Sequence, residues 1–283
     1  MNAEPSPIPA EADRLELART LARDAGELSL TYFNKPSLQI ERKLDGSEVT
    51  EADHECERMI RAKLIEKFPQ DGIMGEEFED RRSDSGYRWI LDPIDGTFSF
   101  ARGVPLYSVL IAVEKLENGE PVDAGVRIGV IAMPALCPPG GGSWGEYVYA
   151  VRGGGAWHQF GNAEPVRARV SDVTDPEHAT TCITTRAHFA RNNALDVLER
   201  ILTATGHSRG WSDAYPAVLL ATGRIEAMVE PNMKPWDNGP MQPIIAEAGG
   251  VCTDWNRRES IHTGSLLATN GHVHDHILAA IKG

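Results

Sequence analysis

The N-terminal part of the chain carries apolar residues at the spacing of a buried helix face. Between residues 11 and 33 they recur every three or four positions, which predicts an amphipathic helix. Pro36 ends this helix, and residues 38–40 begin an extended segment. The helical period returns from Thr50 to about residue 68, so a second helix is expected there.

The middle of the chain is rich in strand-like patterns. Short apolar runs at residues 73–74 and 87–91 predict two strands, and three longer runs follow them. Turn-forming residues, such as Asn118-Gly119, separate the longer runs. The longer runs cover residues 107–115, 124–132 and 146–151.

The C-terminal part, after Asp175-Pro176, alternates between extended and helical patterns. Such a mix favours an α/β (α+β) fold in which helices cover sheets in layers. We interpret residues 1–10 as a flexible tail and residues 11–283 as one domain with two lobes, about 11–175 and 176–283. The extended segments are expected at 181–184, 225–229 and 266–268, and the helices at 194–202, 214–221, 237–248 and 275–281.

The net charge of the chain argues against one class of partner. A formal net charge of −13 over 283 residues argues against a nucleic-acid partner, because such binding needs basic patches that neutralise phosphates. An acidic enzyme that acts on an anionic phosphate needs local positive charge at its site. Bound metal ions can supply that charge.

Hydropathy and cysteine usage are typical of a cytoplasmic protein. No apolar run approaches the roughly 20 residues of a membrane span, and the first ten residues lack the basic start and apolar centre of a signal peptide. The cysteines are far apart and form no Cys-x-x-Cys pair, so we expect neither a disulfide framework nor a structural zinc site. They are Cys56, Cys137, Cys182 and Cys252.

Candidate chemistry begins with the run Asp92-Pro93-Ile94-Asp95-Gly96-Thr97. It follows an apolar strand, so the turn can direct both carboxylates and the Ile94 carbonyl at one point, where Mg²⁺ prefers oxygen ligands. The next residues begin a helical turn, whose free N–H groups can receive a phosphate oxygen. The structural alternative is that Asp92 and Asp95 are turn and N-cap residues.

Three further acidic residues have similar alternatives. Glu76 follows a short strand and is otherwise a solvated surface charge. Asp237 follows Pro235-Trp236 and is otherwise the N-cap of a helix. Asp53 lies three residues after Thr50, in the arrangement of a capping box. Each carboxylate alone has a complete structural explanation.

The order of these motifs resembles the inositol monophosphatase family. Residues 43–53, Gly75-Glu76-Glu77, the segment from Trp89 to Thr97 and Pro235-Trp236-Asp237 occur in the order and rough spacing of that family. The resemblance covers nearly the whole chain beyond the N-terminal tail. It implies a layered αβαβα sandwich and a homodimer.

The resemblance also implies roles for individual residues. Two or three Mg²⁺ ions would be bound by Glu76, Asp92, the Ile94 carbonyl, Asp95 and Asp237. Asp53 and Thr97 would orient and help deprotonate the attacking water, with Glu76 also counted as catalytic. Backbone amides of Gly96 and Thr97 would hold the phosphate. Lys43 either approaches the phosphate or metals when its loop closes, or is solvated.

The substrate prediction rests on a narrower likeness. Phe98-Ser99-Phe100 and residues 212–215 are similar to the bacterial histidinol-phosphate phosphatases of the same family, which implies hydrolysis of histidinol phosphate in histidine biosynthesis. Acid at Asp213 and Glu230 would favour a cationic leaving group, although Asp213 is equally explained as a helix cap. Arg186, with His188, is a candidate for the substrate pocket.

Two rival functions stay open at this point. The first keeps the chemistry and changes the substrate to inositol monophosphate or another small sugar or nucleotide phosphate. The second is a non-catalytic Mg²⁺-binding scaffold. The expected partner is a small phosphorylated metabolite, and neither a nucleic acid nor a membrane is expected.

Overall fold

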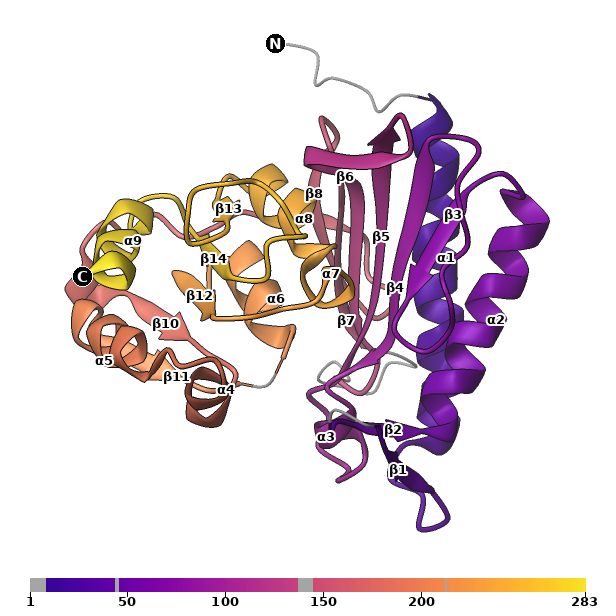
Figure 1. The fold of residues 1–283 in the computed structure, drawn as a ribbon, viewed down its shortest axis with the longest axis horizontal. Helices are drawn as coiled ribbons and strands as arrows, with labels where there is room; N and C mark the ends of the chain where they lie inside the picture. The colour runs from indigo at the N-terminus through magenta and orange to yellow at the C-terminus, as the bar shows by residue number, and fades with distance from the viewer. Residues whose placement is uncertain (1–8, 44–45, 137–144, 212) are drawn as a thin grey trace.

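The computed structural model describes residues 9–43, 46–136, 145–211 and 213–283 (Figure 1). Residues 1–8 of the predicted tail lie outside this range, and the first helix begins at Pro9, two residues before its expected start. The elements form two sheets with helices outside and between them (Figure 1).

The first layer consists of two long helices, α1 (Pro9–Tyr32) and α2 (Glu51–Lys67), which cover one face of the larger sheet. The apolar stripe predicted from the sequence forms the contact. Ala18 and Leu21 of α1 pack in one core cluster with Ile60 of α2 and with Trp89 and Ile111 of the sheet. Burial of this stripe holds both helices in place.

The second layer is a seven-stranded sheet in the order β3-β4-β5-β6-β7-β8-β9. Strands β3 and β4 pair in parallel, and the other neighbours pair antiparallel. A separate hairpin, β1 (Ile40–Arg42) with β2 (Glu48–Thr50), precedes α2. The strands of the sheet are β3 (Gly72–Gly75), β4 (Tyr87–Asp95), β5 (Ser108–Glu117), β6 (Glu120–Met133), β7 (Glu146–Val151), β8 (Gly155–Phe160) and β9 (Val166–Arg167).

Strand β4 is longer than the sequence pattern indicated. The expected strand ended at residue 91, whereas β4 continues to Asp95 with a shift of register between Asp92 and Asp95. Pro93 lies within the shift, and it has no N–H group to give to the sheet. Gly96 then turns the chain with a φ of +81° into the short helix α3 (Thr97–Phe100).

The middle layer contains α6 (Tyr215–Ala221), α7 (Pro235–Asn238) and α8 (Met241–Glu247). Helices α6 and α8 contact both sheets, and their apolar residues form one cluster with residues of each. The single helix expected over residues 237–248 is wrong in detail. It is divided into α7 and α8 at Gly239-Pro240, because proline interrupts the helical hydrogen-bond ladder.

The last two layers are a five-stranded sheet, in the order β11-β10-β12-β14-β13, and an outer helical layer. Helices α5 and α9 pack together there and share a core cluster with the sheet. This confirms the predicted layered fold. The strands are β10 (Thr180–Cys182), β11 (His207–Arg209), β12 (Ala227–Glu230), β13 (Val251–Thr253) and β14 (Leu266–Thr269), and the helices are the 3₁₀ turn η1 (Pro176–His178), α4 (Arg186–Arg191), α5 (Leu195–Ala204) and α9 (His274–Lys282).

Two compositional expectations can be compared with the structure. In the described part of the chain, no helix combines the length and the apolarity needed to cross a bilayer. Cys56, Cys182 and Cys252 are buried free thiols, and Cys137 lies outside the described residues.

Candidate active site

Three carboxylates from distant parts of the chain converge between the two sheets. One oxygen from each of Asp92, Asp95 and Asp237 lies within 4.8 Å of the other two. The first two stand at the end of β4, and the third stands on α7, which packs against β4. A set of close, mostly buried carboxylate oxygens suits a hard divalent cation such as Mg²⁺. The residues therefore fit the metal that the sequence implied.

The electrostatics of the cluster favour a bound cation. Burial raises the pKa of Asp92 well above its usual range, and the charges of Glu76, Asp95 and Asp237 raise it further. The pKa of Asp95 is raised in the same way, by burial and then by Asp213 and Asp237. Burial also raises the pKa of Asp237, to about 7. A cation among these groups would relieve the repulsion that produces the shifts.

Hydrogen bonds orient Asp95 and Asp237 within the cluster. Asp95 Oδ2 accepts from Ser108 Oγ at 2.7 Å and from the Ala214 N–H at 2.9 Å. Asp237 Oδ2 accepts from the Lys234 N–H at 2.9 Å, so Asp237 caps α7 from its third position and is not the N-cap. These bonds leave the other oxygen of each group for a ligand, so capping and cation binding are compatible.

Glu76 lies beside the cluster and is paired with a lysine. Lys43 Nζ is 2.6 Å from Glu76 Oε1 and 2.8 Å from Glu77 Oε1. Burial alone would lower the pKa of Lys43, but its hydrogen bonds to the two glutamates outweigh that effect and raise it. The loop between β1 and β2 thus already reaches the acidic site, and Lys43 is not simply solvated.

Asp53 connects the start of α2 to the turn after β4. Its Oδ2 accepts from the Thr50 N–H at 2.8 Å and from Thr50 Oγ1 at 2.6 Å. Its Oδ1 faces Thr97 Oγ1 at 3.1 Å, and Thr97 Oγ1 is also 3.0 Å from the Ile94 carbonyl oxygen. One oxygen of Asp53 thus stabilises the helix, and the other reaches the Asp92–Thr97 run.

Gly96 permits a close approach between the two halves of the chain. A Cβ atom at this position would lie 2.9 Å from Asp213 Oδ2, and the φ of +81° is itself costly for other residues. Asp213 precedes Ala214, the N-cap of α6, and so does not hold the N-cap position. The carboxylate of Asp213 therefore lies against the turn that follows Asp95.

Glu230 is fully buried, and its two oxygens are already used. Oε1 accepts from the N–H and the hydroxyl of Thr184, the latter at 2.8 Å, and Oε2 is 3.0 Å from His188 Nδ1. His188 is the more accessible member, with a side chain that is 22% exposed. A positive charge on His188 would lower the pKa of Asp237, so the imidazole is within electrostatic range of the carboxylate cluster. Glu230 thus faces the site through His188.

Arg186 is placed differently from the other predicted residues. It is exposed at the start of α4, and the described residues offer it no hydrogen bond or ion pair. Ser212, part of the motif that suggested the substrate, lies outside the described residues.

Sequence reasoning missed several residues that support the site. Glu77 shares Lys43 with Glu76; the motif Gly75-Glu76-Glu77 contained it, but no role was assigned to it. Ser108 fixes Asp95 from the first position of β5, where a serine shows no distinctive pattern. Thr184 binds Glu230 across 46 positions, a partnership that only the folded chain reveals.

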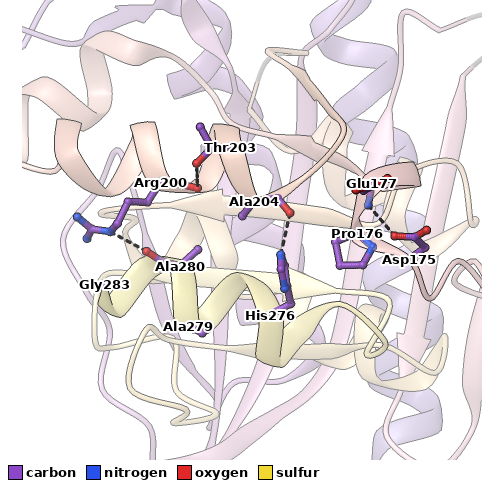
Figure 2. Close-up of a pocket in the computed structure, with 10 residues that line it drawn as sticks. All are labelled: Asp175, Pro176, Glu177, Arg200, Thr203, Ala204, His276, Ala279, Ala280 and Gly283. Atoms are coloured by element: carbon purple, nitrogen blue, oxygen red, sulfur yellow. Dashed lines mark hydrogen bonds between the residues drawn. The ribbon is translucent and has the colours of Figure 1, made fainter.

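A separate hollow lies at the outer edge of the second sheet (Figure 2). This groove of about 730 Å³ has paired polar groups: Arg200 donates to the Ala280 carbonyl at 2.7 Å, and His276 Nε2 is 2.8 Å from the Ala204 carbonyl. It contains no cluster like that of Asp92, Asp95 and Asp237, so we assign the chemistry to the carboxylate site. The groove is lined by Asp175, Pro176, Glu177, Arg200, Thr203, Ala204, His276, Ala279, Ala280 and Gly283.

Known proteins are similar in sequence to this chain over nearly their whole length. The chain is 41% identical to a histidinol-phosphatase of Chlorobaculum parvum, over 94% of this chain and 96% of that protein. It is 35% identical to a histidinol-phosphatase of Mycobacterium tuberculosis (95% and 98%) and 32% identical to a fructose-1,6-bisphosphatase/inositol-1-monophosphatase of Thermotoga maritima (95% and 96%).

Solved structures and the family model agree with these relatives. An IMPase from Thermotoga maritima superposes with a TM-score of 0.78 at 31% identity, covering 95% of this chain and 97% of that one. An inositol monophosphatase from Zymomonas mobilis gives a TM-score of 0.80 at 26% identity, covering 98% and 100%. The model of the inositol monophosphatase family matches residues 11–283. The chain therefore belongs to the inositol monophosphatase family, a family of metal-dependent phosphatases.

Proposed function

We propose that this protein is a Mg²⁺-dependent phosphomonoesterase that hydrolyses L-histidinol phosphate to L-histidinol and phosphate. The observation that carries the chemistry is the convergence of Asp92, Asp95 and Asp237 beside the Asp53–Thr97 pair. The substrate is supported by the acidic and imidazole groups around Asp213 and Glu230, and by the histidinol-phosphatases among the relatives.

The metal ions would be held by Asp92, Asp95, Asp237, Glu76 and the Ile94 carbonyl, and we expect two or three of them. Bound there, Mg²⁺ supplies positive charge that lowers the pKa of water and stabilises the departing oxygen. Glu76 becomes available as a ligand when Lys43 moves away from it. Because Lys43 would then lie beside an anionic substrate, its ammonium can contact the phosphate.

Asp53 and Thr97 would carry the proton of the attacking water. Thr97 Oγ1 can accept that proton while donating its own to Asp53 Oδ1, 3.1 Å away. Burial raises the pKa of Asp53, and its hydrogen bonds from Thr50 and Thr97 offset part of the rise. A carboxylate whose pKa is raised is a better base than an exposed one. The oxygen of the water then bonds to phosphorus as the ester P–O bond breaks in line. The departing oxygen takes up a proton from solvent to give the alcohol, and Asp53 returns its proton to solvent.

The turn at Gly96 would hold the phosphate. The first N–H groups of a helix have no acceptor within the helix, so those of Gly96 and Thr97 at the start of α3 can bind phosphate oxygens. The carboxylate of Asp213 lies against the same turn, since a Cβ atom on Gly96 would be 2.9 Å from its Oδ2, and we assign it to the leaving group. In this arrangement the phosphate and the amino alcohol both lie close to the turn at Gly96.

The leaving group of histidinol phosphate carries an ammonium and an imidazole, both of which donate hydrogen bonds. Asp213 offers a carboxylate to such donors. In neutral His188, Nδ1–H donates to Glu230 and Nε2 is left as an acceptor. We therefore assign recognition of the leaving group to Asp213 and His188, with Glu230 orienting the imidazole. Arg186 stays a weaker candidate, since it is exposed.

A panel of phosphate esters tests the proposed substrate. Phosphate release from histidinol phosphate, inositol 1-phosphate, fructose 1,6-bisphosphate and a nucleoside monophosphate is measured with and without Mg²⁺. We expect histidinol phosphate to have the highest kcat/KM and to require Mg²⁺. Equal or faster turnover of inositol 1-phosphate would refute the substrate assignment and leave the phosphatase chemistry in place.

His188→Ala is expected to lower kcat/KM for histidinol phosphate by about 10–100-fold, the loss of one hydrogen bond to a charged group. Activity on glycerol 2-phosphate, whose leaving group has no N–H donor, should change little. Steady-state kinetics on both esters give the ratio of the two kcat/KM values.

The matched control is His158→Ala. His158 Nε2 is 2.9 Å from the buried Glu146, so the variant breaks a similar pair on β8. It should leave the ratio of the two kcat/KM values unchanged. If His188→Ala also left that ratio unchanged, the assignment of His188 would be wrong.

The cellular setting is part of the same proposal. We place the reaction in histidine biosynthesis in the cytoplasm and expect a homodimer. Light scattering on the purified protein measures the mass in solution, and a monomeric mass would contradict the expected assembly.

A further inference from the structure

A loop of the C-terminal half crosses onto the larger sheet. Residues 254–265, here named the strap, join β13 to β14, two strands of the smaller sheet. Ile261 of the strap is only 1% exposed. It packs in a cluster with Ile90 of β4, Ala112 of β5 and Val126 of β6, which belong to the other sheet. The strap therefore adds a connection between the two halves of the molecule, beside helix α7.

The apolar neighbours of Ile261 stand next to the acidic residues of the site. Ile90 lies two positions before Asp92, so both side chains project from the same face of β4. Two partly buried members of the cluster, Met74 and Trp236, precede Glu76 by two positions and Asp237 by one. The apolar cluster that contains Ile261 thus includes residues from all three segments that carry the predicted metal ligands.

Polar contacts fix the strap on both sides. His262 Nε2 is 2.7 Å from Glu114 Oε1, and the same buried carboxylate pairs with Arg88 at 2.6 Å. The Ala124 N–H donates to the Glu259 carbonyl at 2.6 Å. On the other side, the Met233 N–H donates to the Gly264 carbonyl at 2.5 Å, just before the helix that carries Asp237.

We propose that Ile261 and His262 are positioning residues for the metal site. The strap holds the segment of Asp237 against the strand of Asp92 and Asp95. The affinity for the metal ion therefore depends on how the strap packs against the larger sheet. This inference rests on the proposed function only in its assumption that the carboxylates bind a divalent cation. No feature of the substrate enters it.

The test measures Mn²⁺ binding by electron paramagnetic resonance on the purified full-length protein, without substrate. His262→Leu removes the contact to Glu114 but leaves that carboxylate paired with Arg88, so the fold should persist. We expect the Kd for Mn²⁺ to rise by about 10-fold or more, as for residues that orient metal ligands. His262→Gln can still donate to Glu114 and should recover most of the affinity.

His158→Leu is the matched control. Glu146, its partner, is also buried and is also paired with an arginine, Arg224. This variant should lose a similar amount of thermal stability without a change in the Kd for Mn²⁺. Ile261→Val, a smaller change in the apolar part of the strap, should raise the Kd as well and gives a second variant if His262→Leu does not fold.

Two results would overturn the inference. One is an unchanged Kd for Mn²⁺ in folded His262→Leu or Ile261→Val, which would leave the strap a purely stabilising role. The other is an equal rise in the His158→Leu control. Because the readout is metal binding, wild-type protein that binds Mn²⁺ but fails to hydrolyse histidinol phosphate would refute the proposed substrate and leave this inference standing.

Discussion

Asp95→Asn is expected to lower Mg²⁺-dependent kcat/KM by about 10³-fold or more while leaving the chain folded. Removing one ligand charge weakens the binding of a metal ion that would supply several kcal/mol of transition-state stabilisation. Each loss of about 1.4 kcal/mol lowers the rate tenfold. The fold should survive because the amide oxygen of asparagine can still accept from Ser108 and from the Ala214 N–H. The measurement is phosphate release across a Mg²⁺ titration.

The same substitution should also stabilise the metal-free protein or leave its Tm unchanged. Burial and the charges of Asp213 and Asp237 raise the pKa of Asp95, so its ionised form is costly without a cation. The contrast is Asp71→Asn. Asp71 is buried in an ion pair with Arg14 and accepts from Trp89 Nε1, so that variant should lose stability and keep its Mg²⁺ dependence. If the Asp95→Asn variant turned over substrate at the wild-type rate, the assignment of Asp95 to the metal site would be wrong.

The stabilisation by Mg²⁺ is expected to grow strongly as the pH rises from about 5 to 8. Burial raises the pKa of both Asp237 and Glu77 to about 7, well above the usual range of carboxyl side chains. A carboxyl whose folded-state pKa is raised binds protons more tightly when folded. Its contribution to stability is thus complete below about pH 4 and is lost as the pH rises through 7. Asp237, the predicted ligand of the two, would bind a metal ion in its deprotonated form.

Thermal unfolding with and without Mg²⁺ at several pH values measures this effect. With Mg²⁺ at about 100 times its Kd, the stabilisation is about 2.7 kcal/mol per site, or roughly 5–10 °C in Tm for a chain of this size. It should be small near pH 5 and largest near pH 8. Asp237→Asn should reduce the pH dependence of the stabilisation by Mg²⁺, since it removes one titrating ligand. A Mg²⁺ effect of equal size at every pH would contradict the electrostatic account.

The sequence predicted which carboxylates converge better than it predicted the local structure around them. Asp92, Asp95 and Asp237 do meet, although the pattern placed the first two in a turn and the structure places them in a strand with a shifted register. A proline in a strand resembles a turn signal, since it lacks an N–H in either case. The break at Gly239-Pro240 was hidden by the apolar period on both sides.

Some contacts could not be predicted because no local pattern encodes them. His262 and Glu114 are 148 positions apart, and in the sequence each residue alone is typical of a protein surface. Glu230 was expected to face the substrate, whereas Thr184 and His188 occupy both of its oxygens. Such pairings arise when two sheets pack against a shared layer, and only the folded chain brings their partners together.

Anomalous diffraction from crystals grown with Mn²⁺ tests the central claim most directly. We predict at least one strong peak within about 2.3 Å of carboxylate oxygens from Asp92, Asp95 and Asp237 together, a distance typical of oxygen ligands to divalent cations. A Mn²⁺ peak elsewhere, with none between these three side chains at saturating metal, would contradict the account.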